Sequence, residues 1–267
     1  MRKVWAFLAR DFQSAVSYKF DFAFQFARVL IGVATFYFLG KLVTPAGPKF
    51  LAPYGGDYFR FVLIGIAFNQ YIAVAVQSFS QRIVESQQLG TLEALFVTQT
   101  GATTIILASS VYGFLWATVS VAAYLLAGAL LFGADLGQAN YPAAAAVMAL
   151  TVTGLSSFGV FSAAFVLLFK KGDPVSWMIA ALSGLLGGVL FPIAVLPGWL
   201  QTIAKAVPLT WALDGMRRAL LMGAGLADLR ADLLVLAAFS VLLLPLSLAL
   251  FHKAVQRAKR DGTLTHY

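Results

Sequence analysis

Long hydrophobic runs separated by short polar segments make up most of the chain. Six runs lack Asp, Glu, Lys, Arg and His, and they cover residues 29–40, 61–81, 101–134, 136–169, 174–204 and 233–251. A helix needs about 20 apolar residues to cross the hydrocarbon core of a bilayer. Backbone groups in lipid must be hydrogen-bonded within their own segment, so we expect transmembrane helices. They are predicted at residues 22–43, 58–80, 107–132, 144–168, 174–195 and 231–252.

The predicted fold class is all-α, a polytopic membrane protein with six transmembrane helices. Because the hydrophobic runs follow one another along the whole chain, residues 1–267 are expected to form a single transmembrane domain. Residues 1–21 place Trp5, Leu8 and Phe12 at helical spacing, with basic and polar residues between them. This pattern predicts an N-terminal amphipathic interfacial helix; a simple lead-in to the first span is the alternative.

Prolines interrupt the apolar pattern after the fifth predicted span. Proline does not fit a helix interior, and the segment is too apolar for an ordinary loop. We therefore expect residues 196–224 to form an outer re-entrant helical region before the last span, with a second short helix that starts near Leu209. Asp214 precedes Arg218 by four residues, the favourable order for an ion pair on a helix. The residues that define this region are Pro197, Trp199, Pro208, Asp214 and Arg218.

A few polar or small residues inside the predicted spans are candidate functional positions. Asn69, Gln70 and Gln77 lie in the second span, where amides either line a path or hydrogen-bond between helices. Gly184 and Gly188 form a Gly-x-x-x-Gly pair in the fifth span, a spacing that lets two helices approach closely. The pair is a candidate dimer contact, and a contact within one chain is equally compatible with it.

The distribution of charge predicts the sidedness of the chain. Only 11% of the residues are charged, and the formal net charge is +8. The N-terminal segment, the tail of residues 253–267 and the segments after the second and fourth predicted spans together hold eleven Lys and Arg, against seven in the segments on the other side of the membrane. The positive-inside rule therefore places both termini and residues 80–101 in the cytoplasm. Because the positive charge lies beside spans, we expect membrane lipid as a partner and no nucleic acid.

The types of residue present argue against catalysis by this chain. Its two histidines, His252 and His266, follow the last charge-free run, and it has no cysteine. There is no Gly-x-x-x-x-Gly-Lys-Ser/Thr motif for binding nucleotide phosphates. The six charge-free runs hold no carboxylate or histidine for a proton relay. We therefore expect a non-catalytic membrane subunit with no metal or cofactor of its own.

The stretch "SQRIVESQQLGTLEALFVTQTG", residues 80–101, is polar between two hydrophobic runs. Leu89, Leu92 and Phe96 are spaced to form one apolar helix face. Gly90 interrupts the helix, and Thr91 can cap a new one that has Glu93 in its first turn. Residues 81–100 are thus predicted to form a short cytoplasmic helix between two spans. Such an element can transmit motion when another protein pushes on it.

Two segments of the sequence resemble the membrane subunits of ABC-2 type exporters. "ESQQLGTLEALFVTQTG" is similar to that family's cytoplasmic coupling helix, whose pattern is Glu, then Gly-Thr-Leu-Glu-x-Leu, then Thr-Pro. Here Gln99 stands where the family often has Pro. "LPGWLQTIAKAVPLTWALDGMRRAL" resembles the family's outer re-entrant region before the last span. The amphipathic start and the six spans agree with this resemblance.

The resemblance implies a permease that works with a separate ABC ATP-binding subunit. ATP and Mg²⁺ would be bound by two copies of that subunit, and the permease would pair with a second copy of itself or with a paralogue. The implied membrane is the inner membrane of a bacterial or archaeal cell. Residues of the coupling helix that would contact the ATPase are Glu85, Gly90, Thr91, Leu92, Glu93, Leu95 and Thr98.

The apolar spans, with their scattered aromatic residues, favour a hydrophobic or amphipathic substrate. A drug, a lipid or a lipid-linked glycan would fit this description. Two other classes of function are alternatives. One is an ion-coupled secondary transporter or channel that acts without an ATPase partner. The other is a membrane scaffold that transports nothing.

Overall fold

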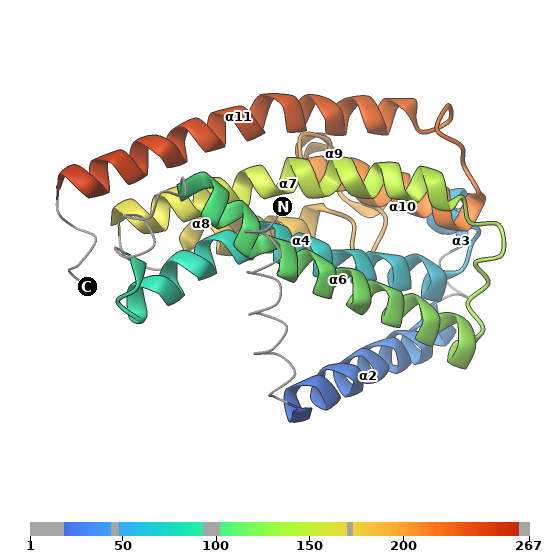
Figure 1. Ribbon diagram of the computed structural model, residues 1–267. Coiled ribbons are helices and arrows are strands. Elements are labelled where there is room, and N and C mark those ends of the chain that lie inside the picture. Colours follow the sequence, from blue (N-terminus) through green and yellow to red (C-terminus); the bar gives the residue numbers. More distant parts are fainter. Residues whose placement is uncertain (1–18, 44–47, 93–101, 170–172, 262–267) are drawn as a thin grey trace.

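The computed structural model describes residues 19–43, 48–92, 102–169 and 173–261. Within these ranges every regular element is a helix (Figure 1), as the all-α prediction requires. Most of the N-terminal segment 1–21 and the last residues of the tail 253–267 lie outside the described residues. So do Phe96 and the coupling residues Glu93, Leu95 and Thr98.

Five of the described helices are long and apolar enough to cross a membrane. They coincide with the first four predicted spans and the last one, although α4 and α11 each continue eight residues beyond the predicted end of the span. The chain is thus a multi-pass helical membrane protein. The five helices are α2 (Lys19–Val43), α4 (Tyr58–Gln88), α6 (Ala102–Phe132), α7 (Tyr141–Phe169) and α11 (Arg230–Arg260).

The fifth span, predicted at residues 174–195, is wrong as one continuous helix. α8 (Pro174–Leu186) has 13 residues, which gives about 20 Å of helix against a hydrocarbon core of about 30 Å. It starts after Asp173, whose carboxylate accepts a 2.9 Å hydrogen bond from the Ser176 backbone N–H. It ends at Leu186, with Gly187 as its C-cap, and Gly188 has a φ of +71°. Glycine adopts this left-handed conformation at little cost, so the helix stops while the sequence is still apolar.

Short helices occupy the region predicted to be re-entrant. A 3₁₀ turn, η2 (Ile193–Val195), leads to α9 (Gly198–Lys205) and α10 (Pro208–Met222). α10 starts one residue before the predicted position. Its first turn abuts the end of α8, where the Thr210 hydroxyl donates to the carbonyls of Ala204 at 2.6 Å and Leu186 at 3.4 Å. How deeply α9 and α10 lie in a membrane stays a prediction.

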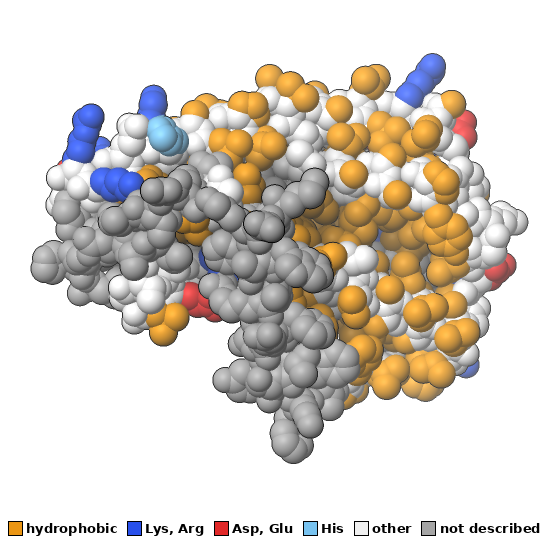
Figure 2. Space-filling view, viewed as in Figure 1, with side chains coloured by type: hydrophobic (Ala, Val, Ile, Leu, Met, Phe, Trp, Pro, Cys, Tyr) orange, Lys and Arg blue, Asp and Glu red, His pale blue; other side chains and the backbone are white. Residues whose placement is uncertain are grey.

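The long helices lie side by side in a bundle, with α11 along one edge and α2 along the other (Figure 1). α4 is the most enclosed of them, because 67% of the most apolar stretch of this helix is buried, against 17% for the corresponding stretches of α2 and α11. Figure 2 shows hydrophobic side chains across the middle of one face and basic side chains towards the ends. This distribution fits a surface in contact with lipid.

The bundle has two ends, which we name by the helices that finish there. α4, α7 and α11 finish at the C-terminal end, where α6 and α8 begin. α2 and α10 finish at the opposite end, where α4 and α11 begin. Two small elements, α3 (Pro48–Leu51) and η1 (Ala52–Tyr54), also lie at the opposite end.

Glycine allows α4 and α7 to cross closely. A Cβ at Gly159 of α7 would lie 2.4 Å from the Ala75 carbonyl oxygen of α4 and 2.6 Å from the Phe79 ring. In α8, by contrast, a Cβ at Gly184 would meet no atom within 4 Å. Both glycines lie within helices, but Gly159 faces another helix closely and Gly184 faces open space.

We predict that Gly159→Ala lowers the thermal unfolding temperature of the detergent-purified protein. The added methyl group forces the α4–α7 contact apart, at a cost of about 1–3 kcal/mol. Gly184→Ala is the matched control, which should leave stability unchanged or raise it, because alanine favours helix by up to about 1 kcal/mol. Equal unfolding temperatures for the two variants would contradict the close crossing.

Candidate functional site

The predicted coupling segment begins where α4 ends, at the C-terminal end of the bundle. Glu85, in the last turn of α4, is exposed and pairs with Arg82 at 3.1 Å. Gly90 has a φ of +65°, and the Thr91 backbone N–H folds back to the Ser86 carbonyl at 2.9 Å. Gly90 is thus the residue that stops α4, as the sequence predicts, and both Gly90 and Thr91 are exposed.

Leu92 anchors this turn in the interior. Its side chain is 2% exposed, whereas Leu89 is 76% exposed. The two leucines therefore do not share an apolar face, because the Gly90 turn separates them, and that part of the prediction is wrong. Leu92 belongs to a buried cluster drawn from the ends of four helices. Its partners there include Phe79, Ile83, Ile105, Ile106, Val160, Leu167, Phe251 and Val255.

A face of α4 next to α8 carries two of the predicted path residues. Asn69 and Gln77 line a cavity of about 360 Å³ together with Gly184 of α8. Gln77 also lines a second cavity, of about 260 Å³, with Gln81 and Glu85. Residues 69, 77, 81 and 85 are spaced by multiples of four, so they form a polar stripe that winds around the helix from its α8 side to its α6 side. Gln70 does not line either cavity and is half-buried.

The glycine pair of the fifth predicted span does not form a common helix face. Gly184 lies on the exposed side of α8, whereas Gly188 is buried beyond the end of that helix. Gly184 alone remains a candidate for contact with a second copy. The carbonyl of Gly188 has a partner within the chain instead.

That partner is Arg217 of α10, which the sequence interpretation missed. Its side chain is 2% exposed and donates to the carbonyls of Phe61 (3.1 Å), Gly188 (2.8 Å) and Val189 (2.9 Å). The guanidinium carbon lies 3.4 Å from the centre of the Phe61 ring. Within the described residues Arg217 forms no ion pair, so carbonyl oxygens and an aromatic face surround its charge.

A signal for this placement was present in the sequence. Arg217 shares helical spacing with Leu213 and Leu220, which are also buried. An arginine in register with the apolar positions of a helix faces the interior, where it must find hydrogen-bond acceptors. The carbonyls left free where a helix ends are such acceptors.

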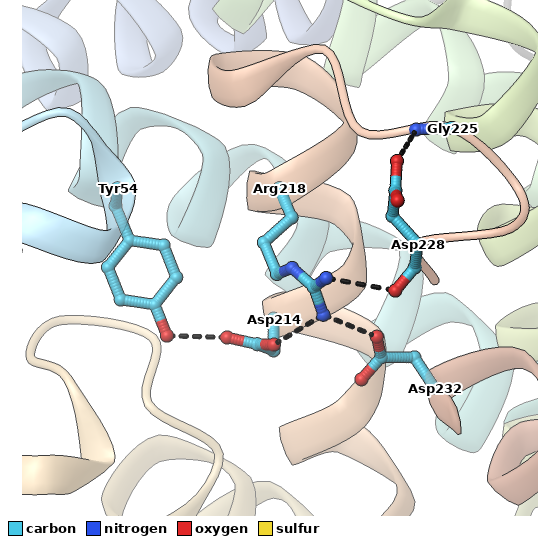
Figure 3. Close-up of polar contacts among 6 residues, drawn as sticks. All are labelled: Tyr54, Asp214, Arg218, Gly225, Asp228 and Asp232. Atoms are coloured by element: carbon cyan, nitrogen blue, oxygen red, sulfur yellow. Dashed lines mark hydrogen bonds and ion pairs between the residues drawn. The ribbon is translucent and has the colours of Figure 1, made fainter. Parts of the chain in front are cut away.

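The next residue, Arg218, lies in a cluster of polar residues at the opposite end (Figure 3). The predicted pair with Asp214 is present at 3.8 Å, but the shorter contact is with Asp232 of α11, at 3.1 Å. Arg218 also donates to the Asp228 carbonyl at 2.9 Å. The Tyr54 hydroxyl donates to Asp214 at 2.5 Å. The cluster therefore joins η1, α10 and the start of α11.

Burial and the neighbouring Asp214 raise the pKa of the Tyr54 phenol well above its ordinary value. The phenol therefore stays protonated and serves as a hydrogen-bond donor. The other residues of the predicted re-entrant region lie at the starts of the two short helices. Pro208 is buried in the first turn of α10, Pro197 precedes α9, and Trp199 is 66% exposed.

We predict that Arg217→Met destabilises the protein. Methionine fills similar space but leaves the carbonyls of Gly188 and Val189 without their donor, and an unpaired buried polar group costs about 1–3 kcal/mol. The thermal unfolding temperature of the detergent-purified chain should fall by several degrees. Arg230→Met removes an exposed arginine at the start of α11 and should change little. Unfolding of both variants at the wild-type temperature would contradict the assigned role of Arg217.

A family model described as ABC-2 type transporter matches residues 2–221, which is most of the chain. No curated protein matches it. The matched region includes the polar stripe of α4, the Gly90 turn, the short α8 and Arg217. The chain therefore belongs to the ABC-2 type transporter family.

Proposed function

We propose that this chain is the permease subunit of an ATP-driven exporter and that the segment after α4 couples it to a separate ATP-binding subunit. The observation that carries the proposal is the anchoring of Leu92 beside the exposed Gly90 turn. One side of this turn is open to a partner, and the other is packed where α4, α6, α7 and α11 meet. The family match supports the pairing with an ATPase.

The packing around Leu92 suits the transmission of force. Protein interiors are close-packed and resist compression, so a displacement of the exposed turn must move the side chains that surround Leu92. These side chains belong to four long helices. A partner that grips Glu85, Gly90 and Thr91 would therefore shift helix ends and not only a surface loop. Glu93, Leu95 and Thr98 complete the proposed contact.

The proposed orientation puts the C-terminal end in the cytoplasm. Lys253, Arg257, Lys259 and Arg260 cluster on the last turns of α11, and the positive-inside rule assigns such clusters to the cytoplasmic side. The Tyr54–Asp214–Arg218 cluster is then outside. ATP and Mg²⁺ would be bound by the two partner ATPase subunits, and the membrane would be a bacterial or archaeal inner membrane.

The proposed path runs along the α4–α8 face and is completed by a second copy of the chain or by a paralogue. Asn69 and Gln77 offer amide donors and acceptors in a cavity that is otherwise mostly apolar. This combination suits a hydrophobic or amphipathic molecule with a few hydrogen-bonding groups. A drug, a lipid and a lipid-linked glycan all meet this description.

We predict that Glu93→Arg abolishes co-purification with the ABC ATPase and abolishes export. Reversing this charge replaces an attraction by a repulsion at the contact, while membrane insertion should be unaffected. Asp261→Arg is the control, because it makes the same change at an exposed position at the end of α11. Wild-type recruitment and export by Glu93→Arg, or export without any ATPase, would contradict the proposal.

We predict that Gln77→Leu separates transport from assembly. The variant should bind the ATPase normally, yet transport of a hydrogen-bonding substrate should fall about fivefold, the effect of losing one hydrogen bond of about 1 kcal/mol. Transport and ATPase activity would be measured in proteoliposomes. Gln256→Leu, which removes an exposed amide from α11, is the control. Unchanged transport by Gln77→Leu would place the path elsewhere.

A further inference from the structure

A third cavity, larger than the two lined by Gln77, lies on the side of α8 that faces away from Asn69 and Gln77. Its volume is about 420 Å³. Val175, Met178 and Leu182 of α8 form one wall, and Phe239, Leu243 and Leu250 of α11 form the other. Additional lining comes from α7 residues Leu155, Phe158 and Phe161. We call this space the α8–α11 groove.

The groove is apolar almost throughout. Of its lining residues, only three serines are polar. Ser157 donates its hydroxyl to the Thr153 carbonyl, and Ser247 donates to the Leu244 carbonyl, so these two are satisfied within their own helices. A polar molecule would lose its water on entering and gain no hydrogen bonds in return. The lining therefore suits a hydrocarbon chain.

The depth of the groove is that of one leaflet. On α11 the lining runs from Phe239 to Leu250, and eleven residues of helix rise by about 16 Å. Half of a hydrocarbon core is about 15 Å. Ala206–Leu209, the turn between α9 and α10, lines the groove beside the end of α8. This turn takes that position because α8 ends early, at Leu186.

Positive charge follows the groove at the C-terminal end. Leu246, Leu250, Lys253 and Arg257 succeed one another at helical spacing, so both cations continue the lining face of α11. Lys253 and Arg257 are exposed, and basic side chains gather at this end of α11 in Figure 2. Arg257 also lies 3.6 Å from Asp261, but an exposed ion pair of this kind is weak.

We propose that the α8–α11 groove holds one acyl chain of an anionic phospholipid, whose phosphate lies at Lys253 and Arg257. The apolar lining matches the hydrocarbon of an acyl chain, and the depth of the groove matches the length of that acyl chain. The two cations at the C-terminal end match the charge of the phosphate. The acyl chain would fill the space between α8 and α11 and hold the short α8 in place. This site is separate from the proposed path and requires no ATPase partner.

The head-group preference can be measured on the purified full chain. We would titrate detergent-solubilised protein with phosphatidylglycerol or phosphatidylcholine of identical acyl chains, and follow bound lipid by native mass spectrometry. Wild type should retain phosphatidylglycerol at least fivefold better. The Lys253→Gln/Arg257→Gln double variant should lose this preference, whereas Arg230→Gln, at the other end of α11, should keep it. A preference that survives in the double variant would overturn the phosphate assignment.

The acyl-chain position is tested by filling the groove. Leu243→Trp should reduce the binding of both lipids at least fivefold, while Val241→Trp, at a 71% exposed position on another face of α11, should not. Val175→Phe fills the groove from the α8 wall and serves if Leu243→Trp does not fold. Full lipid retention by the folded filled variants would overturn the proposal. It would also be overturned if wild type bound no lipid and filling the groove only dissociated a dimer, since a second copy would then occupy it.

Discussion

The carbonyl groups beyond the end of α8 need hydrogen-bond donors beside a membrane span, and Arg217 provides them for Gly188 and Val189. These carbonyls lie next to the first turns of α4, since a Cβ at Gly65 would be 2.2 Å from the Val189 oxygen. Irregular backbone at membrane depth is stable only where protein groups satisfy it. Burying a guanidinium is costly as well. The two costs offset each other, because the charge needs acceptors and the carbonyls need a donor.

This solution determines the architecture around α8. A helix that stops after 13 residues leaves room for α9 and α10, and the first turn of α10 packs against the end of α8. Two cavities result, one on each side of α8. The cavity towards α4 contains amides, and the groove towards α11 is apolar. The two cavities suit the different roles proposed for them, substrate passage and lipid binding.

α4 connects the two ends of the molecule. It begins beside Arg217, which bonds the Phe61 carbonyl, and it finishes at the Gly90 turn, where Leu92 enters a four-helix core. A single helix of 31 residues is stiff over this distance. A push on the proposed ATPase contact can therefore reach the region of Arg217 without passing through a loop. The polar stripe from Asn69 to Glu85 lies on the same helix.

The sequence by itself determined the helical class, five of the spans, the Gly90 turn and the start of α10, because hydropathy, glycine and proline act locally. It did not reveal that α8 ends at Leu186, since an apolar run continues there and hydropathy cannot distinguish a helix from apolar coil. It placed Asp214 with Arg218 from helical spacing, but not Asp232, which approaches from another helix. Nor did it separate Leu89 from Leu92, or reveal the three acceptors of Arg217. Those partners are distant in the sequence, so only the packing of α4, α8, α10 and α11 could bring them together.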